Sequence, residues 1–477
     1  MASSKTLNQA NLETLGANRL AQLLLELVAG DAQAKRRLRL ELASASGSGD
    51  VAGEVAKRLA TIAKAKAFVD WNKVKPLAQD IEAQRRAIME HIAPTDPATA
   101  LDLLWKLIAL ARPVLSRCDD SHGTLGTVFA TALSDLGTLA AAARLPTDRL
   151  VDRVFDSVCD NDHGQFDGLV ALMTEPLGEA GLKSLRRKFE AMAREVPQQP
   201  PQAERRVIGY GSGGVFYEDE METRRHERVV RQALVDIADA LGDVDAFIAQ
   251  YPPDQRHNPA IAAAIAERLL AAGRTAEAMT ALDAAEATRR RGGHWPDWDR
   301  VRIAALDALG HADEAQAARW ERFATALDAK YLRAYLKRLP DFDDLEAEKR
   351  ALALVRAFPS LPHALHFLLG WPAIDGAAAM LLTRADELDG GPYEILTPAA
   401  EALESRYPLA ATVALRAMID FALDKARVKR YPHAARHLQS CAHLARRIDD
   451  YGGHLDHDAY VTALKAKHAR KRGFWES

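Results

Sequence analysis

Apolar side chains recur along most of the chain at intervals of three and four residues, the spacing that places them on one face of an α-helix. One such set is Leu20, Leu23, Leu24, Leu27 and Val28, and another is Val229, Val230, Ala233, Leu234, Ile237 and Leu241. Short runs typical of strands occur only around one glycine-rich turn, in residues 205–218. We therefore predict an all-α chain in which any strand lies within that segment.

A segment rich in proline and glycine, residues 197–220, predicts a domain boundary. Pro197, Pro200 and Pro201 end a helix, and the glycines of residues 209–214 follow. These glycines match the Gly-x-Gly-x-x-Gly phosphate-binding pattern, but no helix follows them as a dinucleotide fold requires. We predict an N-terminal helical lobe over 1–196, a hinge or small hairpin over 197–220, and a second helical lobe over 221–477.

The second lobe contains an internal repeat. Gly273 and Gly310 each open the phrase Gly-x-x-x-Glu-Ala, and they lie 37 residues apart. In a pair of helices the glycine forms the turn, and the glutamate lies in the first turn of the next helix, where the helix dipole favours it. The period is close to that of a tetratricopeptide repeat. We therefore predict that the C-terminal lobe is a tetratricopeptide-like α-solenoid.

Composition narrows the class of protein. The 477 residues include 63 Lys and Arg against 66 Asp and Glu, a formal charge of −3, which excludes a globally basic nucleic-acid binder. The three cysteines, Cys118, Cys159 and Cys441, are too few and too far apart for a disulfide framework. The sequence predicts a cytoplasmic protein, with neither a signal peptide nor a membrane span.

Positive charge gathers at the C-terminal end. Residues 425–447 contain no acidic side chain, and from residue 425 onward twelve Lys and Arg face five Asp and Glu. The candidate binding residues are Lys465, Lys467, Arg470, Lys471 and Arg472. Such a surface suits nucleic acid or an acidic partner, whereas the alternative is that it docks on acidic helices of the same chain, such as residues 341–348. Gly473 is predicted to end the last helix and to turn Phe474 and Trp475 back onto the preceding helices.

Three potential metal ligands, His433, His437 and Cys441, are spaced four residues apart on one predicted helix. The zinc-protease motif would need a glutamate where Ala434 stands, so that mechanism fails. On a helical wheel His437 and Cys441 lie at the edge of the apolar face, which favours a role in the core. The repeated phrase Cys-Asp-x-x-His-Gly at Cys118 and Cys159 is likewise better explained by helix caps and turns. We expect no metal and no cofactor.

Several phrases resemble those of an uncharacterised family of alanine-rich bacterial helical proteins, a domain of unknown function. They include Leu12-Glu-Thr-Leu-Gly16, Phe68-Val-Asp-Trp71, Leu177-Gly-x-x-Gly181-Leu and the ending from His468 to Trp475. More distantly, the chain is similar to helical regions that accompany SWIM-type zinc fingers, but it lacks the cysteines of the finger itself. The resemblance implies a helical fold and no particular reaction.

Together these features predict a non-catalytic helical-repeat protein that binds a protein or peptide, because a solenoid exposes an extended groove. A nucleic-acid-associated protein that uses the basic C-terminal region is the alternative. A metal-dependent enzyme that uses the histidines and cysteines is the third possibility.

Overall fold

The computed structural model describes residues 7–195, 200–211 and 214–476. Within these residues the fold is all-α apart from one β-hairpin, which confirms the predicted fold class. The helices divide into two compact units, residues 1–253 and 254–477. In each unit a helix packs mainly against the next one or two helices in sequence.

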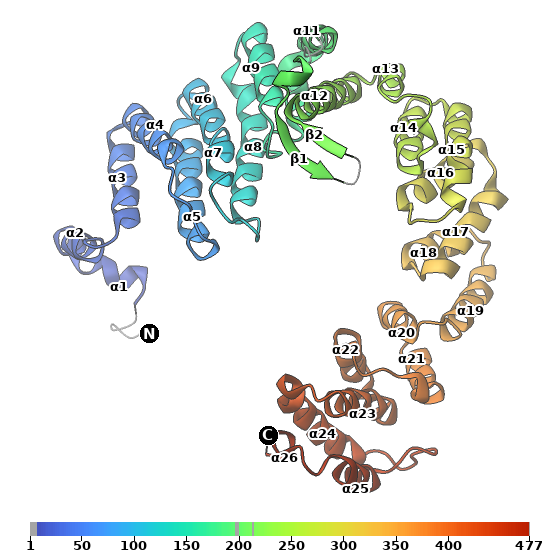
Figure 1. The fold of residues 1–477 in the computed structure, drawn as a ribbon. Helices are drawn as coiled ribbons and strands as arrows, with labels where there is room; N and C mark the ends of the chain where they lie inside the picture. The colour runs from blue at the N-terminus through green and yellow to red at the C-terminus, as the bar shows by residue number, and fades with distance from the viewer. Residues whose placement is uncertain (1–6, 196–199, 212–213, 477) are drawn as a thin grey trace. The chain divides into compact units, whose positions relative to one another are not determined.

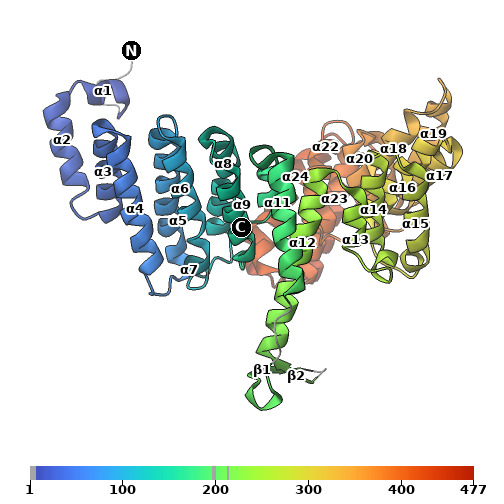
Figure 2. The same ribbon diagram turned by 90° about the horizontal axis from the view of Figure 1, so that it is seen from above.

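The described residues of unit 1 (residues 1–253) form helices and one hairpin, and Figure 2 shows the long helices side by side. The elements are α1 (Gln9–Glu13), α2 (Gly16–Leu27), α3 (Ala32–Ser46), α4 (Ser48–Lys64), α5 (Trp71–Ala87), the π-helical turn η1 (Ile88–Ile92), α6 (Pro97–Ile108), α7 (Ala111–Leu115), α8 (Thr124–Ala143), α9 (Thr147–Cys159), α10 (Leu169–Leu172), α11 (Thr174–Arg194), η2 (Gln202–Glu204), β1 (Val207–Gly211), β2 (Gly214–Tyr217), α12 (Glu218–Leu241) and α13 (Val244–Ala249).

The boundary between the two units does not lie at the predicted position, residues 197–220, because helix α12 belongs to unit 1. This helix packs along α11 and contributes Ala233 and Ile237, both fully buried, to the core of unit 1. The division falls instead after Pro253. The hydrophobic core of unit 1 therefore continues beyond residues 197–220.

The hairpin lies where the sequence predicted strands. Strands β1 and β2 pair antiparallel, with Tyr210 opposite Val215. At its base Arg205 pairs with Asp219 at 2.9 Å and lies over the ring of Tyr217, 3.8 Å from its centre. Figure 2 shows the hairpin at the start of α12, away from the other helices of unit 1. The ring of Tyr210 is therefore 82% exposed.

Helix α8 is, within the described part of the chain, the one helix long and apolar enough to cross a membrane. Its side chains Leu125, Phe129 and Leu136 are buried in the core of unit 1, and it packs against α5 and α6. Core helices of soluble proteins meet the same length and composition test. The composition of α8 alone therefore does not indicate a membrane span.

In the described residues of unit 2 (residues 254–477) every regular element is a helix (Figure 1). Its elements are η3 (Gln255–His257), α14 (Pro259–Ala271), α15 (Thr275–Arg290), α16 (Pro296–Leu309), α17 (Ala312–Ala326), α18 (Ala329–Leu336), α19 (Asp343–Arg356), α20 (Leu361–Gly370), α21 (Ile374–Thr383), η4 (Ala385–Glu387), α22 (Tyr393–Leu403), α23 (Pro408–Asp424), η5 (Val428–Arg430), α24 (Tyr431–Ala445), α25 (His457–His468) and α26 (Arg472–Trp475).

The turns at Gly273 and Gly310 match atom for atom in their backbone hydrogen bonds. Both glycines are left-handed, with φ of 74° and 79°. The amide of Arg274 donates to the carbonyl of Leu269 at 2.8 Å, and 37 residues later the amide of His311 donates to the carbonyl of Leu306 at 3.0 Å. This pattern closes the C-terminal end of a helix. The predicted equivalence of the two turns is confirmed.

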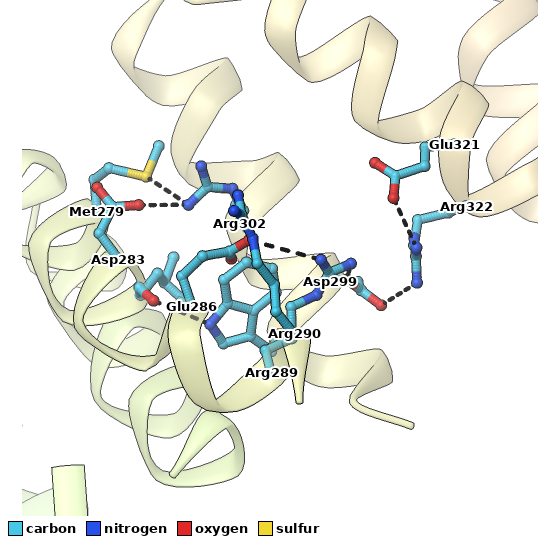
Figure 3. Close-up of polar contacts among 11 residues, drawn as sticks. Met279, Asp283, Glu286, Arg289, Arg290, Asp299, Arg302, Glu321 and Arg322 are labelled. Carbon is cyan, nitrogen blue, oxygen red and sulfur yellow. Dashed lines mark hydrogen bonds and ion pairs between the residues drawn. The ribbon is translucent and has the colours of Figure 1, made fainter. Parts of the chain in front are cut away.

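A buried carboxylate joins three successive helices of unit 2 (Figure 3). Asp299 of α16 is 7% exposed and accepts hydrogen bonds from Arg289 of α15 at 3.0 Å and from Arg322 of α17 at 2.9 Å. The Arg289 guanidinium also lies 4.9 Å from the ring centre of the buried Trp298. A buried carboxylate is tolerated only when it is paired, so Asp299 fixes the positions of both neighbouring helices.

The C-terminal aromatic residues fold back, as predicted. Phe474 is 2% exposed and meets the ring of Tyr431 edge to face, and the Trp475 indole donates to the carbonyl of His468 at 3.0 Å. The predicted role of Gly473 is wrong, because α25 ends at His468 and Gly473 lies inside α26. Residues 469–471 make the turn, and burial of Phe474 holds α26 against α24.

We expect Gly310→Ala to lower the free energy of unfolding by about 1 kcal/mol, because the left-handed backbone strains any side chain there. An added Cβ would meet no atom within 4 Å, so backbone strain is the only expected cost. Gly370→Ala is the matched control, since that site is equally open but lacks a positive φ. Denaturant unfolding measures both variants, and equal stability of the two would contradict the strained turn.

We expect Asp299→Ala to lower the free energy of unfolding by about 3 kcal/mol, because Arg289 and Arg322 would lose their shared carboxylate in a buried site. Asp297→Ala is the control: this residue lies on the same helix, its side chain is 75% exposed, and its ion pair with Arg300 is solvated. Calorimetry of both variants tests the difference. A similar small loss in both would show that Asp299 does not hold the three helices together.

Candidate functional site

A cavity of about 400 Å³ opens between α22, α23 and α24 of unit 2. Tyr393 and Thr397 come from α22, and Met418 and Ala422 from α23. The remaining lining residues are Gly390, Lys429, Arg430, His433, Ala434 and His437. We call these ten residues the cationic pocket, because its charged lining side chains are all basic.

Close approach of the backbone at Gly390 forms one wall of the cationic pocket. A Cβ at this position would lie 1.9 Å from the carbonyl oxygen of Ala417 in α23, so only glycine fits. The chain next passes through Gly391 and Pro392 and enters α22 at Tyr393. The contact at Gly390 therefore sets how closely the start of α22 approaches α23.

Aromatic rings hold Arg430 in place. Its guanidinium lies 4.4 Å from the ring centre of Tyr393 and 5.5 Å from that of Phe421. One nitrogen, Nη1, also donates to the carbonyl of Gly391 at 3.4 Å. Stacking on aromatic faces orients the flat guanidinium while its charge stays available. Arg430 is thus positioned without a carboxylate.

Two histidines complete the basic lining. Arg436 donates from Nη2 to Nδ1 of His433 at 2.9 Å, so Nδ1 is the accepting nitrogen of that ring. Burial lowers the pKa of His437, and the nearby His433 and Arg436 lower it further. His437 is therefore neutral at pH 7, and a bound anion would favour its charged form.

No Asp or Glu lines the cationic pocket, as far as the described residues show. In the same part of the chain neither Lys429 nor Arg430 forms an ion pair. Helix α24 begins next to them at Tyr431, and its N-terminal end adds positive potential. The pocket thus holds positive charge that no carboxylate of the described residues neutralises.

The three candidate metal ligands do not come together. His433 and His437 line the cationic pocket, whereas Cys441 is fully buried in the core of unit 2. Burial raises the pKa of the Cys441 thiol to about 12. In the other candidate motif Asp120 accepts from the amides of Leu125 and Gly126, so it caps α8. Across the residues with described positions, no three His, Cys, Asp or Glu side chains are grouped to hold a metal ion.

The five basic candidates near the C-terminus have different surroundings. Lys467 pairs with Asp424 at 2.7 Å, and Lys471 donates to the carbonyl of Leu423, both at the C-terminal end of α23. Lys465 lies 6.0 Å from the ring centre of Trp475, and Arg470 and Arg472 are exposed. Lys471 is therefore half-buried and engaged within the chain, and Lys467 is exposed but paired with Asp424.

A second cavity, of about 500 Å³, lies in unit 1 between α3 and α5, and both signs of charge line it. Asp80 pairs there with Arg58 and with Arg36, and Glu90 pairs with Arg86 at 3.0 Å. Its charges are largely balanced within the chain. The cationic pocket is therefore the better candidate for binding a charged ligand.

The sequence pointed to only part of the cationic pocket. The spacing of His433 and His437 identified two lining residues, and the acid-free stretch 425–447 contained Lys429 and Arg430. Tyr393 and Thr397 were missed because nothing in a single sequence shows that α22 lies against α24. The pair Gly390-Gly391 before Pro392 was the available signal of a close backbone approach.

Fold and site together define an all-α protein of sequentially packed helices with a cationic pocket. The chain belongs to the family of unknown function DUF6880, whose model matches residues 2–477. The resemblance to an uncharacterised domain family is thereby confirmed. The bacterial origin and the similarity to regions that accompany SWIM-type fingers stay predictions.

Other comparisons add little. Comparison with curated proteins gives no significant match. Among solved structures the chain is similar to a circular tandem repeat protein with novel repeat topology and enhanced subunit contact surfaces. The identity is 14%, the match covers 96% of this chain and 94% of that one, and the TM-score is 0.14. A TM-score this low supports no argument about fold or function.

We expect Lys471→Glu to lower the free energy of unfolding by about 2 kcal/mol. The change removes a charged donor from the carbonyl of Leu423 and adds a negative charge at the C-terminal end of α23. Arg472→Glu is the control on the neighbouring exposed residue, and it should shift stability by less than about 0.5 kcal/mol. Thermal unfolding of both variants measures the difference, and equal shifts would show that Lys471 is not a docking residue.

Proposed function

We propose that the chain is a non-catalytic helical-repeat protein that binds an acidic segment of a protein or peptide partner. The cationic pocket carries this proposal, because it gathers positive charge that no carboxylate of the described chain neutralises. We place the protein in the cytoplasm, where its three free cysteines would stay reduced.

The repeat geometry supports a binding scaffold. Helices α14 and α15 pack against each other across the turn at Gly273, and α16 and α17 do so across the turn at Gly310. Fully buried Ala278 and Ala315 occupy equivalent positions after the two turns. Stacked pairs of this kind are how tetratricopeptide-like solenoids extend, so we propose that architecture for unit 2.

The chemistry of the pocket favours an anionic partner. Lys429 and Arg430 repel each other and any cation, and a carboxylate-rich segment would neutralise both. Tyr393 and Thr397 line the same space and carry hydroxyl groups, of which that of Thr397 donates to the sulfur of Met418 at 3.6 Å. Peptide oxygen atoms and acidic side chains are therefore the groups that this lining suits best.

Nucleic acid is the alternative partner, but fewer of the C-terminal basic residues are free to bind it than the sequence suggested. Lys467 and Lys471 make contacts within the chain, which leaves Lys465, Arg470 and Arg472 at the surface. A metal-dependent enzyme has less support still, because Cys441 points away from the two pocket histidines into the core. An acidic protein segment thus remains the partner that we propose.

Binding of fluorescently labelled decaglutamate, followed by anisotropy at low ionic strength, tests the proposal. We expect saturable binding that weakens as salt is added. Lys429→Glu should weaken the affinity at least about tenfold, because it places a like charge in the pocket. The exposed Lys425 lies in the same acid-free stretch but outside the pocket, so Lys425→Glu is the matched control, with a change within about twofold.

Labelled single-stranded and double-stranded oligonucleotides serve as competing probes. If an oligonucleotide binds more tightly than decaglutamate and shows the same dependence on Lys429, the protein is a nucleic-acid binder and the proposal is wrong. Equal effects of the two lysine changes would also overturn it, since binding would then follow overall charge and not the pocket.

A further inference from the structure

We propose that the cationic pocket recognises a phosphate monoester, such as a phosphorylated side chain of the partner. This inference rests on the proposed function and specifies its ligand. It follows from three properties of the pocket: the number of donors, the amount of uncompensated charge, and the mixture of polar and apolar walls.

The donors outnumber what one carboxylate can accept. Lys429 and Arg430 are positively charged at pH 7, and His433 and His437 add ring nitrogens that can form hydrogen bonds. A carboxylate offers two oxygens and one negative charge, whereas a phosphate monoester offers three terminal oxygens and a charge of about −1.5 to −2 at pH 7. The greater charge and oxygen count of phosphate match this set of donors.

Arg430 has the arrangement that phosphate recognition uses. Its guanidinium carbon lies over the rings of Tyr393 and Phe421, and one guanidinium nitrogen donates to the carbonyl of Gly391, so the group is held in position before any ligand binds. A planar fork binds two oxygens at once, and pre-organisation reduces the entropy that is lost on binding. Lys429, next to it in the sequence, adds a mobile point charge. Together they provide one directed and one adaptable cation.

The size and walls of the pocket indicate an ester and not a free ion. A volume of about 400 Å³ is within the range of sites for small organic molecules, and far above the roughly 30 Å³ of one water molecule. Met418, Ala422 and Ala434 form apolar walls. These walls can contact the carbon atoms of the group that carries the phosphate.

Three labelled peptides of one sequence, with serine, phosphoserine or glutamate at the central position, test the inference by anisotropy. We expect the phosphoserine peptide to bind at least tenfold more tightly than the glutamate peptide, and the serine peptide to bind more weakly than both. Lys429→Gln and Arg430→Lys should each reduce the preference for phosphoserine over glutamate at least threefold. Lys425→Gln is the control outside the pocket and should preserve that preference.

Each other outcome separates this inference from the proposed function. Equal affinity for phosphoserine and glutamate peptides would overturn the phosphate site and leave the acidic-partner proposal standing, and no binding of either would overturn both. A preference that survives Lys429→Gln and Arg430→Lys would place the site elsewhere and overturn the inference. Free O-phosphoserine and inorganic phosphate serve as competitors. If free O-phosphoserine binds with the same affinity as the phosphopeptide, the phosphate monoester site stands but its ligand is a small molecule. The proposal of a peptide partner would then be wrong.

Discussion

Pairing of buried carboxylates with arginines from neighbouring helices is the interaction on which the helix stacking depends in both units. Asp299 meets Arg289 and Arg322 from the helices before and after it, and Asp80 of α5 meets Arg58 of α4 and Arg36 of α3. Apolar contacts are tolerant of small sliding movements, but a buried carboxylate is stable only when its partners reach it. In a fold whose helices contact mainly their sequence neighbours, such pairs fix the spacing from one helix to the next.

Small residues, in turn, allow the backbones of neighbouring helices to lie close together. Fully buried alanines occupy the same position after the turns at Gly273 and Gly310, and Gly390 allows the chain to touch α23 at Ala417. Ala422 of α23 and Ala434 of α24 both line the cationic pocket, and these small side chains fill little of the space beside them. The cationic pocket therefore lies where small side chains leave space between the helices, and longer basic side chains line the same space.

The periodic features of the fold could be predicted from the sequence, whereas features that depend on distant residues could not. Helical spacing, the hairpin in residues 205–218 and the matched turns at Gly273 and Gly310 are local, and each is present in the structure. The boundary was misplaced because burial of Ala233 and Ile237 against unit 1 depends on tertiary contacts. Cys441 was placed at the edge of an apolar face for the same reason: α25 contributes Tyr460 to the core that contains it.

Uncompensated charge explains why the cationic pocket differs from the other basic regions of the chain. Arg384 pairs with Glu387, and Lys467 with Asp424, so these cations are neutralised by carboxylates a short distance away. Lys429 and Arg430 instead directly precede the N-terminal end of α24 and have no ion-pair partner among the described residues, so their positive charges repel one another. A bound anion would remove that repulsion, and any ligand that binds only the folded state stabilises it. A suitable anion would therefore stabilise the folded protein through charges that no described carboxylate pairs, which is the relation expected of a binding site.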